Sequence, residues 1–495
     1  MEMELNKEEL RLWQSVYRGS VRREETLEAV VPDTMPDVAE LLDADAAVFL
    51  RSRETEDGAV TAVLQLTGTV LCRGEGEKSV FAVPLNASVS CRWEDAAIAR
   101  EDQVQLRLAV PAADARLLNP RKLLLRCNLE AEAECFREEV LAYASGAESG
   151  ELQQRRSTGS VSVVSAVGEK TFVITEEFPL SGAEGAESIL HSRVQYMLED
   201  VRNMAGKAVV QGKLLMEVLY TVPGQDVPCL QSFTAPFSQI VDAPGEVSAA
   251  RFTLLPTAEY VESMSGGYGS GGFSLEAHLV AQVVFTEEKE ITYLSDAYST
   301  HCPVELERCE MRLCAQRREV TRHVSIRENV DLAESAERVL WCYVTAETPE
   351  AAEGGRCRLT AHAHVIYVNE RGEIAGKNAR LQTEIEGGEK DCCNMALLPQ
   401  ESYASPAGRG LEFRLGMEWR GWEDESWVMA PLSAVTLRDE EPFDLAARPS
   451  VTAVCSSDED LWTLARRYAS TVELIESANP GARESGGFLL IPRAR

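Results

Sequence analysis

The residues best suited to bind another molecule lie together near the end of the chain. Three adjacent acids, Asp458, Glu459 and Asp460, are followed at once by Leu461 and Trp462. An indole beside carboxylates is typical of a protein interface, because the ring offers apolar area and the acids attract a basic partner. The same tryptophan is also consistent with a half-buried helix residue, so both interpretations of Trp462 stay open.

Other residues could in principle hold a metal or perform catalysis. His362 and His364 lie two positions apart, as ligands on one face of a strand would. A zinc site needs a third and usually a fourth ligand, and the sequence indicates none, so we expect both histidines to face solvent. The cysteine spacing matches no zinc motif, and no nucleophile has a supporting context. We therefore expect no metal, no other cofactor and no enzymatic activity.

The elements around Trp462 are those of a small βααβ module over residues 446–495. Strands are predicted at 451–455 and 486–492, and helices at 461–468 and 472–478. Apolar side chains recur at helical spacing in the first helix, at Leu461, Leu464, Ala465 and Tyr468. Asp460 is expected to cap that helix. Ser470, with Glu473 three positions later, is expected to cap the second.

These residues resemble a LysM domain. The matching positions are Leu461, Trp462, Leu464, Ala465, Tyr468, Val472, Ile475, Asn479, Pro480, Leu490, Ile491 and Pro492. The resemblance implies a binding surface made of Asp458, Glu459, Asp460, Leu461, Trp462, Asn479 and Pro480. LysM domains usually carry a glycine in the first loop, where the backbone grips glycans. Three acids at this place suit a basic protein surface better than a neutral glycan.

Bulk composition narrows the classes of partner. The formal net charge of −31 argues against nucleic acids and anionic membrane surfaces, which are themselves polyanionic. No apolar run approaches the ~18 residues of a membrane-spanning helix. The first residues are acidic and polar, unlike a signal peptide, and the thirteen cysteines are scattered. We therefore expect free thiols and a cytoplasmic location.

The rest of the chain is predicted to contain one mostly-β unit three times. Alternating apolar and polar runs end at Cys72, Tyr220 and Tyr367, which are 148 and 147 positions apart. Short helices are expected before these runs, at 38–42, 187–190 and 333–339. The predicted divisions are an N-terminal helix (1–22), β domains (23–145, 161–300 and 317–445), linkers (146–160 and 301–316) and the terminal module (446–495).

The first of these units resembles the SPOCS (spore coat) domain. It carries Asp33, Met35, Pro36 and Asp37 before a predicted helix, and later the run Asn119-Pro120-Arg121-Lys122. From the residues alone, this second run is either a structural turn or a contact patch. SPOCS repeats followed by one LysM domain resemble a cytoplasmic coat-assembly protein of the mother cell. The resemblance implies that the terminal module binds the coat's morphogenetic ATPase at the forespore surface.

The sequence thus predicts a mainly β protein with three tandem sandwich-like domains and a small C-terminal α+β module. The predicted function is that of a non-enzymatic spore coat or envelope assembly factor. One alternative is a cell-wall protein that binds peptidoglycan or a chitin-type glycan through the LysM module. A second is a carbohydrate-active enzyme with a LysM targeting module, which a clustered, buried pair of carboxylates would indicate.

Overall fold

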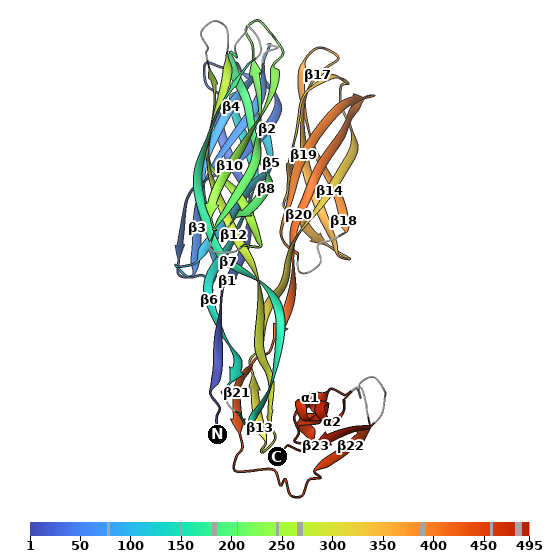
Figure 1. Ribbon diagram of the computed structural model, residues 1–495. Helices are drawn as coiled ribbons and strands as arrows, with labels where there is room; N and C mark the ends of the chain where they lie inside the picture. Colours follow the sequence, from blue (N-terminus) through green and yellow to red (C-terminus); the bar gives the residue numbers. More distant parts are fainter. Residues whose placement is uncertain are drawn as a thin grey trace.

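The computed structural model describes residues 1–494 apart from 77–79, 149, 181–185, 205, 244–246, 265–270, 387–391, 456–458 and 481–487. Its described part is mostly β-strand, with two short helices close to the C-terminal end. Figure 1 shows long strands packed side by side at one end of an elongated molecule and the helices at the other. This arrangement confirms the predicted fold class.

The first unit, copy one (residues 5–147), is a sandwich of two antiparallel sheets. Its strands are β1 (Leu5–Val30), β2 (Val38–Glu56), β3 (Ala59–Gly74), β4 (Val80–Glu94), β5 (Gln103–Asn119) and β6 (Lys122–Ala147). One sheet has the order β1-β6-β5 and the other β2-β3-β4. Alternating side chains of both sheets meet in the core, where Leu64 and Leu66 of β3 join Leu123 and Leu125 of β6.

Copies two (residues 152–299) and three (residues 311–429) repeat this topology. Copy two contains β7 (Leu152–Pro179), β8 (Ser188–Met204), β9 (Lys207–Thr221), β10 (Cys229–Asp242), β11 (Ala249–Met264) and β12 (Gly272–Ser299). Copy three contains β14 (Met311–Asp331), β15 (Ala336–Ala346), β16 (Glu350–Ala352), β17 (Arg356–Asn369), β18 (Ile374–Glu386), β19 (Cys392–Ala407) and β20 (Gly410–Met429). The sheet orders β7-β12-β11 and β14-β20-β19 correspond to β1-β6-β5, and each copy pairs its second, third and fourth long strands in a second sheet.

The three copies close into a ring. The fourth long strand of each copy contacts the second strand of the next: β4 lies against β8, β10 against β15, and β18 against β2. Equivalent leucines of the second strands, Leu42, Leu190 and Leu340, gather in one apolar cluster. One chain therefore builds a pseudo-threefold arrangement through three related but non-identical interfaces.

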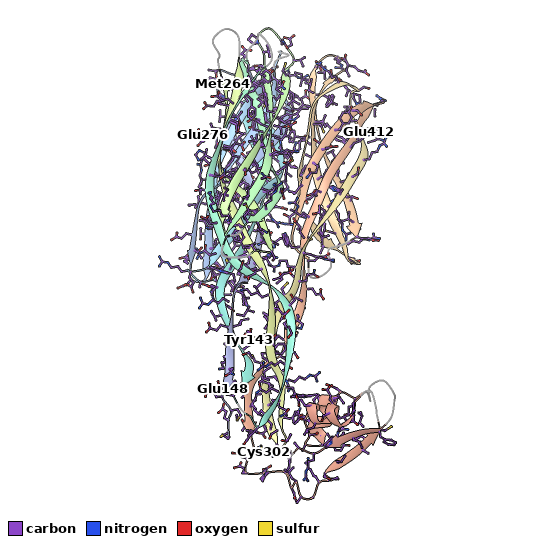
Figure 2. The ribbon with its side chains drawn as sticks, viewed as in Figure 1. Tyr143, Glu148, Met264, Glu276, Cys302 and Glu412 are labelled. Carbon is purple, nitrogen blue, oxygen red and sulfur yellow. The ribbon has the colours of Figure 1, made fainter. Side chains whose placement is uncertain are left out.

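Below the ring, the longest strands continue as a stalk, which Figure 1 shows between the sandwiches and the helices. It comprises residues 5–15 with 136–147, 152–164 with 286–299, and 311–316 with 425–429. Each copy contributes apolar side chains to the core of the stalk, including Leu12, Val163 and Leu313, with Tyr143 beside them (Figure 2). The stalk ends at β13 (Val304–Arg308), which pairs with β21 (Leu432–Leu437).

Several predictions of local structure are wrong. The expected helix over residues 1–22 lies mainly in β1, which pairs with β6 from Leu5 to Val30. Most of the expected linker 146–160 belongs to β7, and Met311–Gln316 of the second linker lies in β14. The short helices expected before the alternating runs belong largely to β2, β8 and β15. In each case, pairing with a strand distant in sequence overrides the local pattern.

The terminal module has the predicted order of elements. Strands β22 (Val451–Cys455) and β23 (Phe488–Pro492) pair, and helices α1 (Leu461–Arg467) and α2 (Val472–Ala478) lie between them in sequence. Asp460 caps α1 by accepting from the amide of Trp462 at 3.4 Å, as expected. The cap of α2 is Thr471, whose hydroxyl accepts from the Leu474 amide, whereas the Ser470 hydroxyl bonds the Pro492 carbonyl.

The two motifs singled out in copy one bind each other. The guanidinium of Arg121 donates to the carbonyls of Pro32 and Met35, at 3.0 and 2.7 Å, and to Asp33 and Asp37, at 3.1 and 3.2 Å. The Arg121 amide donates to the side chain of Asn119 at 2.9 Å. The run 119–122 therefore forms a structural turn that holds the connection between β1 and β2.

We expect Arg121→Ala to destabilise copy one by about 1–2 kcal/mol, because two carbonyls and two carboxylates lose a charged donor. Urea unfolding followed by tryptophan fluorescence measures the change. The matched control is Lys122→Ala, which removes the exposed pair between Lys122 and Glu28 at 2.7 Å and should change little. Equal stabilities of the two variants would show that the Arg121 contacts contribute nothing.

Candidate functional site

The predicted interaction residues of the terminal module fall into two groups. Asp460 and Trp462 lie at the start of α1 and face the stalk. The others serve the module itself or lie elsewhere on it: Glu459 pairs with Arg467 at 3.1 Å, Leu461 is a core residue, and Pro480 is exposed. Asp458 lies outside the described residues.

Asn479 has a structural role at the end of α2. Its amide donates to the Ile475 carbonyl at 2.7 Å and to the Leu490 carbonyl at 2.6 Å, and its side-chain oxygen accepts from the Leu490 amide at 2.7 Å. The side chain thus connects α2 to β23. Its polar atoms are engaged inside the module, so the surface at the start of α1 is the stronger candidate for binding.

That surface contacts the stalk. The Trp462 indole donates to the carboxylate of Asp296 at 2.8 Å, and its ring lies edge-on to Tyr298, with the centroids 4.7 Å apart. Arg155, also from the stalk, donates to Asp460 at 2.6 Å. Both interpretations of Trp462 therefore apply in part, because the ring is half-buried and the contact that buries it is an interface.

A second group of polar residues lies where the three copies meet, and sequence reasoning missed most of it. We call it the axial cluster: Asp43 and Asp45 of β2, His191 and Arg193 of β8, and Tyr343 and His364 of β15 and β17. Positions 43 and 45 of copy one are equivalent to 191 and 193 of copy two and to 341 and 343 of copy three. The pattern that could reveal the cluster is this recurrence of chemically complementary residues at the repeat period.

Most polar groups of the axial cluster pair with one another, although the buried Nε of Arg193 has no hydrogen-bond partner. Asp43 lies 2.9 Å from His364 and accepts from the Tyr343 hydroxyl at 2.6 Å. Asp45 lies 3.1 Å from His191 and accepts from Arg193. The Arg193 guanidinium also lies over the Tyr343 ring, 4.1 Å from its centroid. Asp43 is thus paired with side chains of copy three and Asp45 with side chains of copy two, so this buried pair of carboxylates serves the contact between copies.

The side chains of the axial cluster shift one another's pKa values. Burial opposes ionisation of Asp43, but His364 and the Tyr343 hydroxyl outweigh it, so the pKa of Asp43 is lowered. Burial likewise opposes ionisation of Asp45, yet Arg193 and His191 lower its pKa. Burial, reinforced by the two aspartates, raises the pKa of Tyr343 well above its usual value. Both aspartates are therefore anionic across the physiological pH range.

The axial cluster corrects the prediction for His364. This side chain is 2% exposed, because both faces of β17 are covered. One face carries Ala361 and Ala363 into the core of copy three, and the other turns toward copies one and two. His362 lies nearer the surface, where it pairs with Glu347 at 2.8 Å.

A hollow of about 400 Å³ lies beside β1, β5 and β6 of copy one and is lined partly by copy three. Its arginines are paired with acids, as in Arg22 with Glu130 at 3.3 Å and Arg18 with Glu132 at 3.4 Å. Among the residues that the structure describes, no group of three or more histidines, cysteines or acids is placed to hold a metal ion. No disulfide bond joins any of the eleven cysteines whose side chains the structure describes; six of them are buried, among them Cys302 near the stalk tip (Figure 2).

The fold and these two sites define a mainly β protein of three equivalent sandwiches around a polar axis, with an α+β module on a stalk. Residues 186–264 match the family model described as "SipL, SPOCS domain". The match covers β8 to β11 of copy two, although the motifs noted in the sequence lie in copy one. No curated protein matches the chain. The SPOCS match relates this protein to sporulation and the spore coat. No helix in the described part of the chain is long and apolar enough to cross a membrane.

Proposed function

We propose that this protein is a non-enzymatic assembly factor of the spore coat or envelope in an endospore-forming bacterium. The sandwiches act as spacers or docking surfaces, and the terminal module, which resembles a LysM domain, binds a coat morphogenetic ATPase. In this proposal the protein works in the mother-cell cytoplasm, at the forespore surface.

The observation that carries the proposal is the SPOCS match together with the position of the terminal module. The module lies at the far end of the stalk from the ring, where it can reach a partner while the sandwiches dock elsewhere (Figure 1). Helix α1 and its N-cap carry the indole of Trp462, the carboxylate of Asp460 and the guanidinium of Arg466. These are groups that recognise protein surfaces, since an aromatic anchor flanked by charges is typical of interface hot spots.

The test is binding of the purified full chain to a purified coat morphogenetic ATPase, measured by biolayer interferometry. An aromatic anchor of ~2 kcal/mol corresponds to a loss of roughly 30-fold when Trp462 becomes alanine. Trp462→Ala also removes a contact with the stalk, which offsets part of this loss, so we expect a net weakening of about tenfold. The module should stay folded, because Leu464, Ala465 and Ile475 form its core.

The matched control is Phe488→Ala, since Phe488 is an aromatic residue of the same module and is 72% exposed. Loss of binding in this variant but not in Trp462→Ala would move the interface to the β22–β23 sheet. Titration of the full chain with chito-oligosaccharides tests the alternative function, which is binding of cell-wall glycans. Micromolar glycan binding with no effect of Trp462→Ala on ATPase binding would favour the cell-wall function instead.

A further inference from the structure

The contact between the terminal module and the stalk involves a distinct set of residues on each side. We call Asp460, Trp462 and Arg466 the docking face, and Arg155, Asp296 and Tyr298 the stalk patch. Asp296 accepts from the Trp462 indole at 2.8 Å and lies 3.4 Å from Arg466, so one carboxylate serves two groups of the module. Arg155 completes the contact at Asp460, 2.6 Å away.

Tyr298 enters the module most deeply. It lies on β12 of the stalk and is 2% exposed, yet it belongs to the same apolar cluster as Leu461, Leu464 and Ile475. Its hydroxyl donates to the Ser470 carbonyl at 3.0 Å. The stalk therefore supplies an aromatic group to the module beside the indole assigned to partner binding. It partly covers the docking face, where Trp462 is half-buried while Asp460 and Arg466 keep 48% and 45% of their side-chain surface exposed.

The contact is also suited to reversal. Arg155 and Asp460 are each about half exposed, at 49% and 48% of their side-chain surface, so solvent weakens their attraction. Asp296 also lies 3.4 Å from Arg308 of β13, so its carboxylate keeps a cationic partner when the module leaves. The module is joined to β21 by residues 438–450, and this tether keeps a released module at a high effective concentration near the stalk.

We propose that the stalk patch is an internal substitute for the partner and holds the terminal module in a masked state. This inference rests on the proposed function, in which the docking face binds a protein. The partner surface that displaces the stalk patch then carries the same chemistry: a carboxylate for the indole and Arg466, an adjacent aromatic ring, and an arginine for Asp460. Binding requires undocking, so the apparent affinity falls by the fraction of molecules that are open.

The test changes the stalk side alone, leaving the docking face intact. Arg155→Ala/Asp296→Ala should open the module and tighten binding to the purified coat morphogenetic ATPase about threefold, corresponding to an open fraction of about one third in the unaltered chain. Opening is read independently by chymotrypsin cleavage after Phe443 in the tether, which should become faster. The matched control is Glu290→Ala, which removes an exposed acid from the same strand, β12, and should alter neither reading.

The outcomes separate this inference from the proposed function. Adding Trp462→Ala to the opened double variant should weaken ATPase binding by roughly 30-fold, since no masking remains to offset the loss of the anchor. Unchanged tether cleavage in the double variant overturns the masked state. Faster cleavage with unchanged affinity overturns it as well, because the stalk then competes with nothing. If neither the unaltered chain nor any of its variants binds the ATPase, the proposed function is overturned, and the masking role with it.

Discussion

Asp45→Ala should destabilise the ring by about 3–5 kcal/mol, because Arg193 is then left in the axial cluster without its counter-charge. Arg193 and Asp45 come from different copies, and their side chains are 14% and 11% exposed. Urea unfolding measures the loss, and hydrogen exchange in β2 and β8 shows whether it is located at the axis. The expected result is faster exchange in both strands.

The controls for Asp45→Ala separate charge from packing. Arg193→Met/Asp45→Ala removes both charges and should recover a large part of the stability, since replacing a buried pair by apolar groups costs far less than breaking it. Arg92→Ala removes an arginine that pairs with Glu56 and Glu94 on the surface and should leave the unfolding midpoint unchanged. If Asp45→Ala alone is as stable as the unaltered chain, the axial cluster does not hold the copies together through paired charges.

The same cluster predicts a dependence on pH. Because the folded-state pKa values of Asp43 and Asp45 are lowered, their stabilising contribution is complete above the unfolded value near ~3.9. It is lost as the pH falls through the lower folded-state values. The stability difference between the unaltered chain and Asp45→Asn should therefore be largest near neutral pH and shrink below about pH 4.

Gly376→Ala should cost about 3 kcal/mol or more, at the upper end of overpacking effects, and open the interface between copies three and one. A Cβ atom at Gly376 would lie 1.5 Å from the carbonyl oxygen and 2.4 Å from the carbonyl carbon of Leu42. These are backbone atoms of β2, which cannot rotate away. Separating β18 from β2 also moves Asp43, the residue next to Leu42, away from His364.

Thermal unfolding and hydrogen exchange test the Gly376 prediction. The matched control is Gly168→Ala in β7, where the new Cβ would meet only Val283, at 3.9 Å, an ordinary contact distance. The control should unfold at the same temperature as the unaltered chain. Gly376→Ala should unfold at a lower temperature, with faster hydrogen exchange in β2 and β18. Equal behaviour of the two variants would show that the approach of the strands is not close in solution.

The elements that depend on local pattern could be predicted from the sequence. The alternation over Ala208–Tyr220 matches β9 (Lys207–Thr221), and the helical spacing of Leu461, Leu464 and Ala465 matches α1. The repeat period predicts three copies, because equivalent strands share one apolar pattern. Asp460 was also predictable as a cap, since the carboxylate needs only the adjacent helix amides.

Contacts between distant parts of the chain could not be predicted in the same way. Asp43, His191 and His364 have the composition of a solvent-facing strand surface, and only ring closure buries them. The docking of Trp462 depends on Asp296 and Tyr298, which are far from it in sequence and carry no motif. Residues 1–22 combine helix-forming acids with spaced apolar side chains, and pairing with β6 decides their conformation.

Because the three sandwiches belong to one chain, the side chains at equivalent axial positions need not be identical. Three separate identical chains would place the same side chain at each equivalent axial position, so an aspartate at position 43 would meet two more aspartates. Within one polypeptide, each copy can change alone, and the equivalents of Asp43 are His191 and Trp341. Fusion also fixes a ratio, because this chain carries three sandwiches and one terminal module. A homotrimer of single-sandwich chains, each ending in such a module, would instead carry one module for every sandwich.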